Sequence, residues 1–211
     1  MPVKVVLFDS LLYHINPIKA MSYKGHLVLI VGPSGSGKGS VIRGLKDRHP
    51  DWLYPVSYTT REMRPGEKDG EVYNFISKEK FLDGVKDREF LEYAIVHEDH
   101  YYGTAKKEII DALEKGNVVV REVDIQGFKL IRDQLPAENL TSLFLMVNSL
   151  EDLIGRILKR SKLPDDEVER RMQSARHEMA ERDNCDFVVP SVTGEVEACT
   201  DQVEKIILSR I

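Results

Sequence analysis

Short runs of apolar residues alternate with amphipathic stretches along most of the chain. The first run covers 27–31, and runs of the same kind follow at 118–120, 143–147 and 187–189. A run without polar interruption is typical of a strand that is buried on both faces of a sheet. The stretches between these runs favour helices over 38–48, 104–115, 150–160, 165–182 and 196–208. Strands that alternate with helices predict an α/β fold with a parallel sheet.

Residues typical of helix ends support these boundaries. Ser149 precedes the 150–160 stretch as a candidate N-cap, and Asp152 follows it at the capping-box spacing. Gly116 comes directly after the 104–115 stretch, where a glycine commonly ends a helix. Pro164 immediately precedes the 165–182 stretch. The predicted helices therefore begin and end at residues that suit those positions.

One internal segment departs from the alternation. The stretch 56–103 is polar, rich in turn residues and dense in Arg and Tyr. We interpret it as a lobe inserted into a sheet domain whose core is formed by 25–55 and 104–211. Residues 1–24 precede the first regular strand, and we expect them to be an inessential extension, with Met21 as an alternative translation start.

Charge and composition exclude several classes of protein. The 211 residues carry a formal net charge of −5, which argues against a nucleic-acid-coating protein. A local basic site can still bind a small anion on an acidic protein. The two cysteines give neither a disulfide framework nor a metal-site spacing, as expected for a cytoplasmic protein. No apolar run approaches the ~18–20 residues that a membrane-spanning helix needs, so we expect no membrane partner.

A glycine-rich segment follows the first apolar run and opens the first predicted helix. Its residues are Gly32, Pro33, Ser34, Gly35, Ser36, Gly37, Lys38, Gly39 and Ser40. The spacing is that of a P-loop, in which backbone N–H groups and a helix N-terminus surround a phosphate. We expect this loop to bind a nucleoside triphosphate and Lys38 to reach its β- and γ-phosphates. Because Gly39 stands where Ser or Thr is usual, Ser40 is the candidate Mg²⁺ ligand, directly or through water.

Five further motifs follow in order. They cover 57–67, 69–75, 89–93, 101–104 and 122–127. Together with the P-loop, this ordered set resembles guanylate kinase from about His26 to the C-terminus. The resemblance implies a P-loop NTPase fold with a three-layer parallel-sheet core, a mixed α+β lobe for the nucleoside monophosphate at 56–103 and a helical lid at 156–175. It also implies a cytoplasmic enzyme of purine nucleotide metabolism that transfers phosphate from ATP to GMP with Mg²⁺.

The resemblance also implies the residues that bind the acceptor GMP. They are Ser57, Arg61, Arg64, Tyr73, Glu92, Tyr102, Thr104 and Asp124. Guanidinium forks and phenol hydroxyls suit the acceptor phosphate. A carboxylate accepts from the adjacent N1–H and N2–H donors of guanine, which adenine lacks, and the two hydroxyls suit O6 and N7. We expect the transferring phosphoryl to be stabilised by Lys38, Arg61, Arg64 and three lid arginines, Arg156, Arg160 and Arg171.

Alternatives remain open at this stage. The arginines could be surface charges or, in the lid, could pair with Asp165, Asp166 and Glu167; Tyr73 and Tyr102 could be core aromatics; and Glu92 could be a solvated helix-end charge. A non-catalytic module that binds a phosphorylated peptide would not need the intact P-loop. A kinase for a sugar phosphate would not need the residues that suit guanine.

Four other features lack a clear role. Pro190 and Ser191 stand where the family often places Asn and Asp near the adenine. Arg121 is unusual in a buried strand, and Glu122 could support Mg²⁺ through water or orient its neighbours. The segment 97–100 combines His, Glu and Asp, but we interpret it as a turn rather than a metal site. No oligomeric state follows from the sequence, and we expect no nucleic-acid partner.

Overall fold

A computed structural model of the chain describes residues 21–96, 99–160 and 164–211, without the side chains of Val96 and Arg160. Its core is a parallel four-stranded sheet in the order β6-β1-β7-β8. These strands are β1 (His26–Val31), β6 (Val118–Val123), β7 (Leu140–Met146) and β8 (Phe187–Pro190). Each contains all or most of one of the apolar runs, so the predicted parallel sheet is confirmed.

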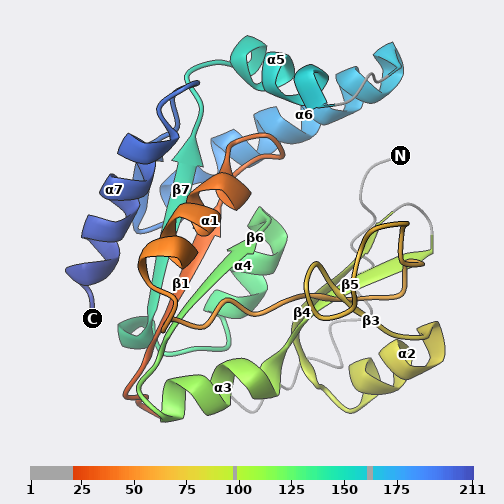
Figure 1. Cartoon of the computed structure of the whole chain (residues 1–211), viewed down its shortest axis with the longest axis vertical. Coiled ribbons are helices and arrows are strands. Elements are labelled where there is room, and N and C mark those ends of the chain that lie inside the picture. Colours follow the sequence, from red (N-terminus) through yellow and green to blue (C-terminus); the bar gives the residue numbers. More distant parts are fainter. Residues whose placement is uncertain (1–20, 97–98, 161–163) are drawn as a thin grey trace.

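Helices cover both faces of this sheet and complete three layers (Figure 1). On one face, Val28 and Ile30 of β1 pack with α1 (Lys38–Arg48) and α7 (Val196–Leu208). On the other face, Leu27 and Leu29 pack with α3 (Lys106–Glu114) and α4 (Ile125–Arg132). Burial on both faces is the reason that β1 has no polar alternation.

The predicted helices agree closely with the structure, with two differences in their bounds and two omissions. The bounds of α1, α7 and α5 (Leu150–Arg160) are those predicted, and Ser149 Oγ accepts a hydrogen bond from the Asp152 N–H at 3.1 Å. Helix α3 begins at Lys106 because Thr104 still belongs to a strand. Helix α6 (Asp165–Ala180) ends before a 3-10 turn at Arg182–Asn184. Two short helices were not predicted as such: α4, and α2 (Lys78–Lys86) within the lobe.

The inserted lobe is a second, mixed sheet with one helix. Its strand order is β3-β2-β5-β4, with β2 (Tyr58–Thr59), β3 (Asn74–Phe75), β4 (Phe90–Val96) and β5 (His100–Ala105). Helix α2 (Lys78–Lys86) packs Phe81 against Phe90 with ring centroids 4.4 Å apart. In Figure 1 this lobe lies beside the parallel sheet, whereas α5 and α6 lie beyond the carboxyl ends of β1 and β7.

The start of the described chain already belongs to the core. Tyr23 is buried, and its backbone N–H donates to Asn139 Oδ1 at 3.0 Å. Residues 1–20 of the predicted extension lie outside the described residues, as do residues 97–98 of the 97–100 segment. Among the residues that are described, no group of His, Cys, Asp and Glu is arranged to hold a metal ion by itself.

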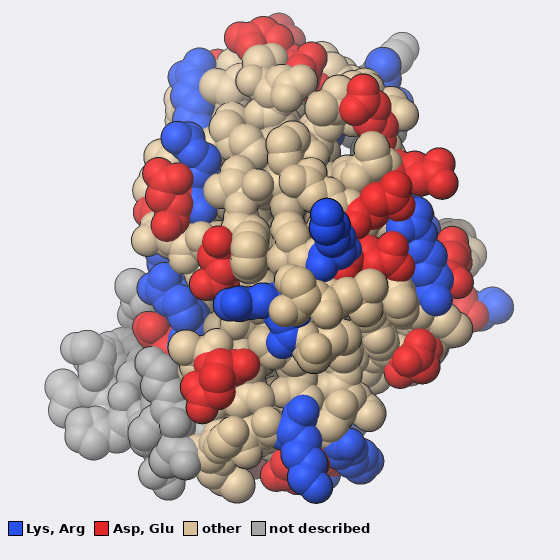
Figure 2. All heavy atoms as spheres, turned by 90° about the vertical axis from the view of Figure 1, so that its left-hand side faces the viewer, with Lys and Arg blue, Asp and Glu red and all other residues tan. Residues whose placement is uncertain are grey.

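The surface charges fit the acidic composition. On the face that Figure 2 shows, Lys and Arg side chains are interspersed with Asp and Glu rather than gathered into one basic area. The described residues include no helix that is both long and apolar enough to cross a membrane.

Candidate active site

The P-loop joins β1 to α1 and is shaped by glycines. Gly37 has φ +98° and stands at the N-cap of α1, a left-handed conformation that favours glycine. A Cβ at Gly32 would lie 2.9 Å from the carbonyl oxygen of Leu145. Because Gly37 has no side chain to cap α1, the first N–H groups of the helix face the loop without a side-chain partner. The loop therefore offers backbone donors to an anion.

Lys38 supplies the positive charge of this loop. Its Nζ donates to the carbonyl oxygens of Gly32 at 2.6 Å and Pro33 at 3.1 Å, which holds the ammonium across the loop. A cleft of about 620 Å³ opens here. It is lined by Gly32, Ser34, Gly35, Gly37, Lys38, Gly39, Ser40, Arg43, Glu122, Val123, Asp124 and Glu178. Of the nine predicted P-loop residues, Pro33 and Ser36 do not line it, and Ser36 is buried.

Oxygen atoms suited to Mg²⁺ line the same cleft. Ser40 Oγ accepts a hydrogen bond from Arg43 at 3.0 Å, and a Cβ at Gly39 would lie 3.9 Å from Glu122 Oε2. Together with Asp124, these residues supply a hydroxyl and two carboxylates, the hard oxygen ligands that Mg²⁺ prefers. The donor set fits Mg²⁺ that also takes oxygens from a bound phosphate.

Glu178 is a cleft residue that the sequence analysis missed. It reaches the cleft from α6 and accepts a hydrogen bond from Ser174 at 3.1 Å. Burial raises the pKa of Glu178 to about 7, while the positive charge of Lys38 acts in the opposite direction. The side chain therefore titrates near neutral pH, next to the lysine of the P-loop. Nothing distinguishes it in the sequence from the other acidic residues of α6.

Arg156 is fixed beside the P-loop by Ser191. The guanidinium of Arg156 donates to Ser191 Oγ at 3.0 Å, to the Ser191 carbonyl at 2.5 Å and to Thr193 Oγ1 at 2.9 Å. Ser191 Oγ in turn donates to the carbonyl oxygen of Ser36 at 2.6 Å. Ser191, which had no role in the sequence analysis, thus connects a lid arginine to the phosphate loop.

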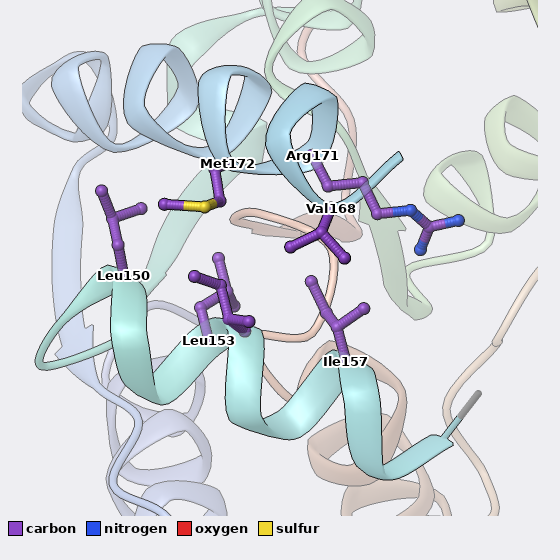
Figure 3. A pocket seen from close by; sticks show the side chains of 7 residues that line it. Leu150, Leu153, Ile157, Val168, Arg171 and Met172 are labelled. Carbon is purple, nitrogen blue, oxygen red and sulfur yellow. The ribbon is translucent and has the colours of Figure 1, made fainter. Parts of the chain in front are cut away.

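A second lid arginine, Arg171, does not line the cleft. The Nε of Arg171 donates to Glu167 at 2.8 Å, one of the alternative ion pairs considered from the sequence. Figure 3 shows Arg171 beside the apolar contact between α5 and α6, with its guanidinium directed away from the neighbouring apolar side chains. The side chain of Arg160, at the end of α5, lies outside the described part of the chain.

Arg61 is held in the lobe by an acid and two aromatic rings. Its guanidinium donates to both carboxylate oxygens of Glu67 at 2.9 Å and lies 5.4 Å from the ring centroids of Tyr73 and Phe75. The backbone N–H of Arg64 donates to the same Glu67 carboxylate at 2.8 Å, while the Arg64 side chain is exposed. A carboxylate on Arg61 occupies the donors that a phosphate would use.

The two candidate tyrosines belong to the same cluster. The rings of Tyr73 and Tyr102 meet edge to face with centroids 5.4 Å apart. Burial raises the pKa of Tyr73, so its hydroxyl stays protonated and can donate. The structure thus brings Arg61, Tyr73 and Tyr102 together, with the Arg64 backbone nearby.

Glu92 lies in a strand of the lobe rather than at a helix end. It is paired across β4 and β5 with Thr104, whose hydroxyl donates a hydrogen bond to the Glu92 carboxylate. A Cβ at Gly127 would lie 3.4 Å from both Glu92 Cγ and Asp124 Oδ1, so the start of α4 brings these two acids close together. Burial raises the pKa of Glu92, while Thr104 and the charge of Arg121 lower it. Asp124 Oδ1 also caps α4 by accepting from the Gly127 N–H at 2.7 Å.

The predicted residues thus form two groups in this structure. The P-loop, Asp124 and Arg156 lie at or beside the cleft, whereas Arg61, Tyr73 and Tyr102 cluster in the lobe. Glu92 connects the groups because it contacts Thr104 in the lobe and lies close to Gly127 of the core. Ser57 and Thr104 both accept hydrogen bonds from Arg121.

Comparison with known proteins shows the family of the chain. A guanylate kinase family model matches residues 24–210. A guanylate kinase of Campylobacter jejuni is 37% identical over 190 residues, covering 90% of each chain. One from Latilactobacillus sakei is 40% identical over 190 residues, covering 90% of this chain and 91% of that protein. The crystal structure of guanylate kinase from Anaplasma phagocytophilum superimposes with a TM-score of 0.67 at 26% identity, covering 90% of this chain and 87% of that one. This chain belongs to the guanylate kinase family.

Proposed function

We propose that this protein transfers the γ-phosphoryl group of ATP to GMP, producing ADP and GDP. The observation that carries the proposal is the meeting of two sites at the start of α4. Asp124 lines the P-loop cleft, and Gly127, three residues further on, packs against Glu92 of the lobe. A triphosphate on the loop and a purine beside Glu92 would therefore bind next to each other.

The donor phosphates would bind in the P-loop cleft. The N–H groups at the start of α1 would surround the β-phosphate, and Lys38 would exchange the carbonyls of Gly32 and Pro33 for phosphate oxygens. Arg156 is already anchored beside the loop through Ser191. Arg160 and Arg171 are proposed to join it when the lid, formed by residues 156–175, closes and excludes water.

The acceptor phosphate would bind in the Arg61 cluster. A phosphate would replace Glu67 on the guanidinium of Arg61, with donors from Tyr73 and Tyr102 and the exposed side chain of Arg64. Phosphoryl transfer depends mainly on positioning and on neutralising the charge of the transferring group. Lys38 and the arginines supply that neutralisation, and no covalent intermediate with the protein is needed.

The donor oxygens in the cleft support a Mg²⁺ requirement. Ser40 would hold the ion, directly or through water, with Glu122 as a further oxygen ligand or as a partner of bound water. Mg²⁺ bound with ATP would neutralise charge on the donor phosphates.

The base pocket would select guanine. The Glu92 carboxylate can accept from N1–H and N2–H together, with Asp124 near the same edge. Adenine would leave that buried carboxylate without its partners, and a polar mismatch of this kind can discriminate by ~10⁴ or more.

We place the enzyme in the cytoplasm, where Cys185 and Cys199 would remain thiols, as they are in the structure.

An acceptor panel tests the proposal. With ATP and Mg²⁺, the purified protein should phosphorylate GMP far faster than AMP, CMP, UMP or ribose 5-phosphate, as measured by chromatography of the products. Equal rates on GMP and AMP would contradict the base assignment. Turnover of ribose 5-phosphate alone would indicate a sugar-phosphate kinase, and no turnover with any acceptor would favour a binding module.

A further inference from the structure

Arg121 is a buried cation at the boundary between the core and the lobe. It lies in β6 opposite Leu29 of β1, and only 9% of its surface is exposed. An arginine is almost never buried in this way unless its charge and donors are satisfied. A strand position opposite Leu29 could hold an apolar side chain, so packing alone does not account for an arginine at position 121.

The guanidinium binds the two chain segments that connect the core to the lobe. One nitrogen donates to the Pro55 carbonyl at 2.7 Å, and the other donates to Ser57 Oγ and to Thr104 Oγ1, the latter at 3.1 Å. Its Nε has no hydrogen-bond partner among the described residues. Burial lowers the pKa of Arg121, and the negative charges of Glu92 and, more weakly, Glu122 oppose this change.

These contacts determine whether the Ser57 and Thr104 hydroxyls donate or accept their remaining hydrogen bonds. A hydroxyl that accepts from a guanidinium has its oxygen occupied by a cation and is polarised to donate its own hydrogen. Thr104 donates that hydrogen to Glu92, which orients the carboxylate. Ser57 also accepts from Arg121, so its hydrogen points away from the guanidinium and is available to an acceptor.

We propose that Arg121 is a positioning residue for the acceptor base. Through Thr104 it orients the Glu92 carboxylate as an acceptor, and it makes Ser57 a hydrogen-bond donor. A 6-oxo purine presents an acceptor to Ser57 and donors to Glu92. A 6-amino purine would instead place its amino group, a hydrogen-bond donor, against the donating hydroxyl of Ser57. Arg121 thus acts on base selection without touching the base. The inference rests on the proposed base pocket.

The test compares Arg121→Leu, Arg121→Lys and the control Arg132→Leu, a partly exposed arginine at the end of α4, for their KM and kcat with GMP, AMP and ATP. In Arg121→Leu the KM for GMP should rise about 10- to 100-fold, as expected for lost hydrogen bonds to a charged group. The preference for GMP over AMP should shrink, and the KM for ATP should stay within about twofold. Arg121→Lys keeps the charge but not the fork, and should fall between wild type and Arg121→Leu.

A double-mutant cycle with Ser57→Ala separates positioning from simple structural support. If Arg121 acts through Ser57, Arg121→Leu should cost less in the Ser57→Ala background than in the wild type. Additive effects, or equal increases in the KM for GMP and for ATP, would overturn the inference and leave Arg121 as a structural tie. If Arg121→Leu does not fold in a thermal unfolding assay, Arg121→Lys decides through the same cycle.

The outcomes also separate this inference from the proposed function. A wild-type protein without preference for GMP over AMP would refute the base pocket itself. A wild-type protein that prefers GMP, with Arg121 variants that keep the same preference, would refute only the role of Arg121.

Discussion

Thr104 donates a hydrogen bond to Glu92 from the directly opposite position of the β4–β5 pair. Cross-strand pairing sets this contact through the backbone, so the carboxylate does not depend on a mobile loop for its position. Gly127 lies against the other side of Glu92, because a Cβ there would already be in van der Waals contact with the glutamate, 3.4 Å from its Cγ. The acid is therefore held by the lobe on one side and by the core on the other.

Replacement of Glu92 by Gln should relax base selection. The amide keeps the shape of the side chain but presents an NH₂ group where guanine has donors, so kcat/KM for GMP should fall about 100-fold, the range for losing charge-assisted hydrogen bonds. The preference for GMP over AMP should shrink with it. The control is Glu89→Gln, an exposed residue near the start of β4. An unchanged GMP preference in Glu92→Gln would remove Glu92 from the base pocket.

Replacement of Lys38 by Ala should abolish turnover without unfolding the protein. The ammonium is the only cation of the described P-loop, and the loss of one preorganised group at a transferring phosphoryl costs about 10²–10³ in kcat or more. Steady-state kinetics with GMP and ATP measure the effect. The matched control is Lys46→Ala on the exposed face of the same helix. A wild-type rate in Lys38→Ala would contradict the phosphate-loop interpretation.

The regular parts of the fold could be predicted because burial leaves a direct pattern in the sequence. Val28 and Leu29 pack on opposite faces of the sheet, so β1 shows no polar position. Helix α3 was predicted two residues too early because Thr104 and Ala105 extend a strand that pairs with Glu92 and Phe90 of the preceding strand, β4. Pairing with another strand is an effect that the helical pattern of 104–115 itself does not contain.

The sequence likewise indicated some residues of the candidate site and not others. Motif spacing indicated the P-loop, and the structure places Lys38 in its cleft. The same reasoning could not find Ser191, which departs from the usual family residues and acts through the carbonyl of Ser36. The sequence shows only that Arg121 is unusual in a buried strand. Its role could not be predicted, because its partners are a backbone carbonyl and two hydroxyls that come together only in the folded chain.

Replacement of Ser191 by Ala should weaken ATP binding. The change removes the donor to the Ser36 carbonyl and one acceptor of Arg156, and an unsatisfied buried group costs about 1–3 kcal/mol. We expect a several-fold higher KM for ATP, with the KM for GMP nearly unchanged. Ser209→Ala, on an exposed serine after α7, is the control. Equal changes in both KM values would show that Ser191 supports the fold in general rather than the donor site.

Replacement of Glu178 by Gln should change how stability depends on pH. Burial raises the pKa of Glu178 from its ordinary 4.5 to about 7, so between these values the folded protein holds a proton that the unfolded chain releases. The free energy of unfolding therefore falls as pH rises through this window, by about 3 kcal/mol at most. A glutamine has no charge to bury, so the free energy of unfolding no longer falls with pH for this reason. Relative to wild type, Glu178→Gln should thus gain stability from pH 5 to pH 8.

Urea unfolding at pH 5 and pH 8 measures this gain, with Glu169→Gln on the exposed face of the same helix as the control. The stability difference between Glu169→Gln and wild type should be nearly the same at both pH values, whereas that of Glu178→Gln should grow. A constant difference for Glu178→Gln would mean that Glu178 is ionised throughout, with Lys38 outweighing its burial.

The same charge bears on the proposed activity, because an ionised Glu178 beside Lys38 opposes a triphosphate in the cleft. Glu178→Gln should therefore lower the KM for ATP more at pH 8 than at pH 6.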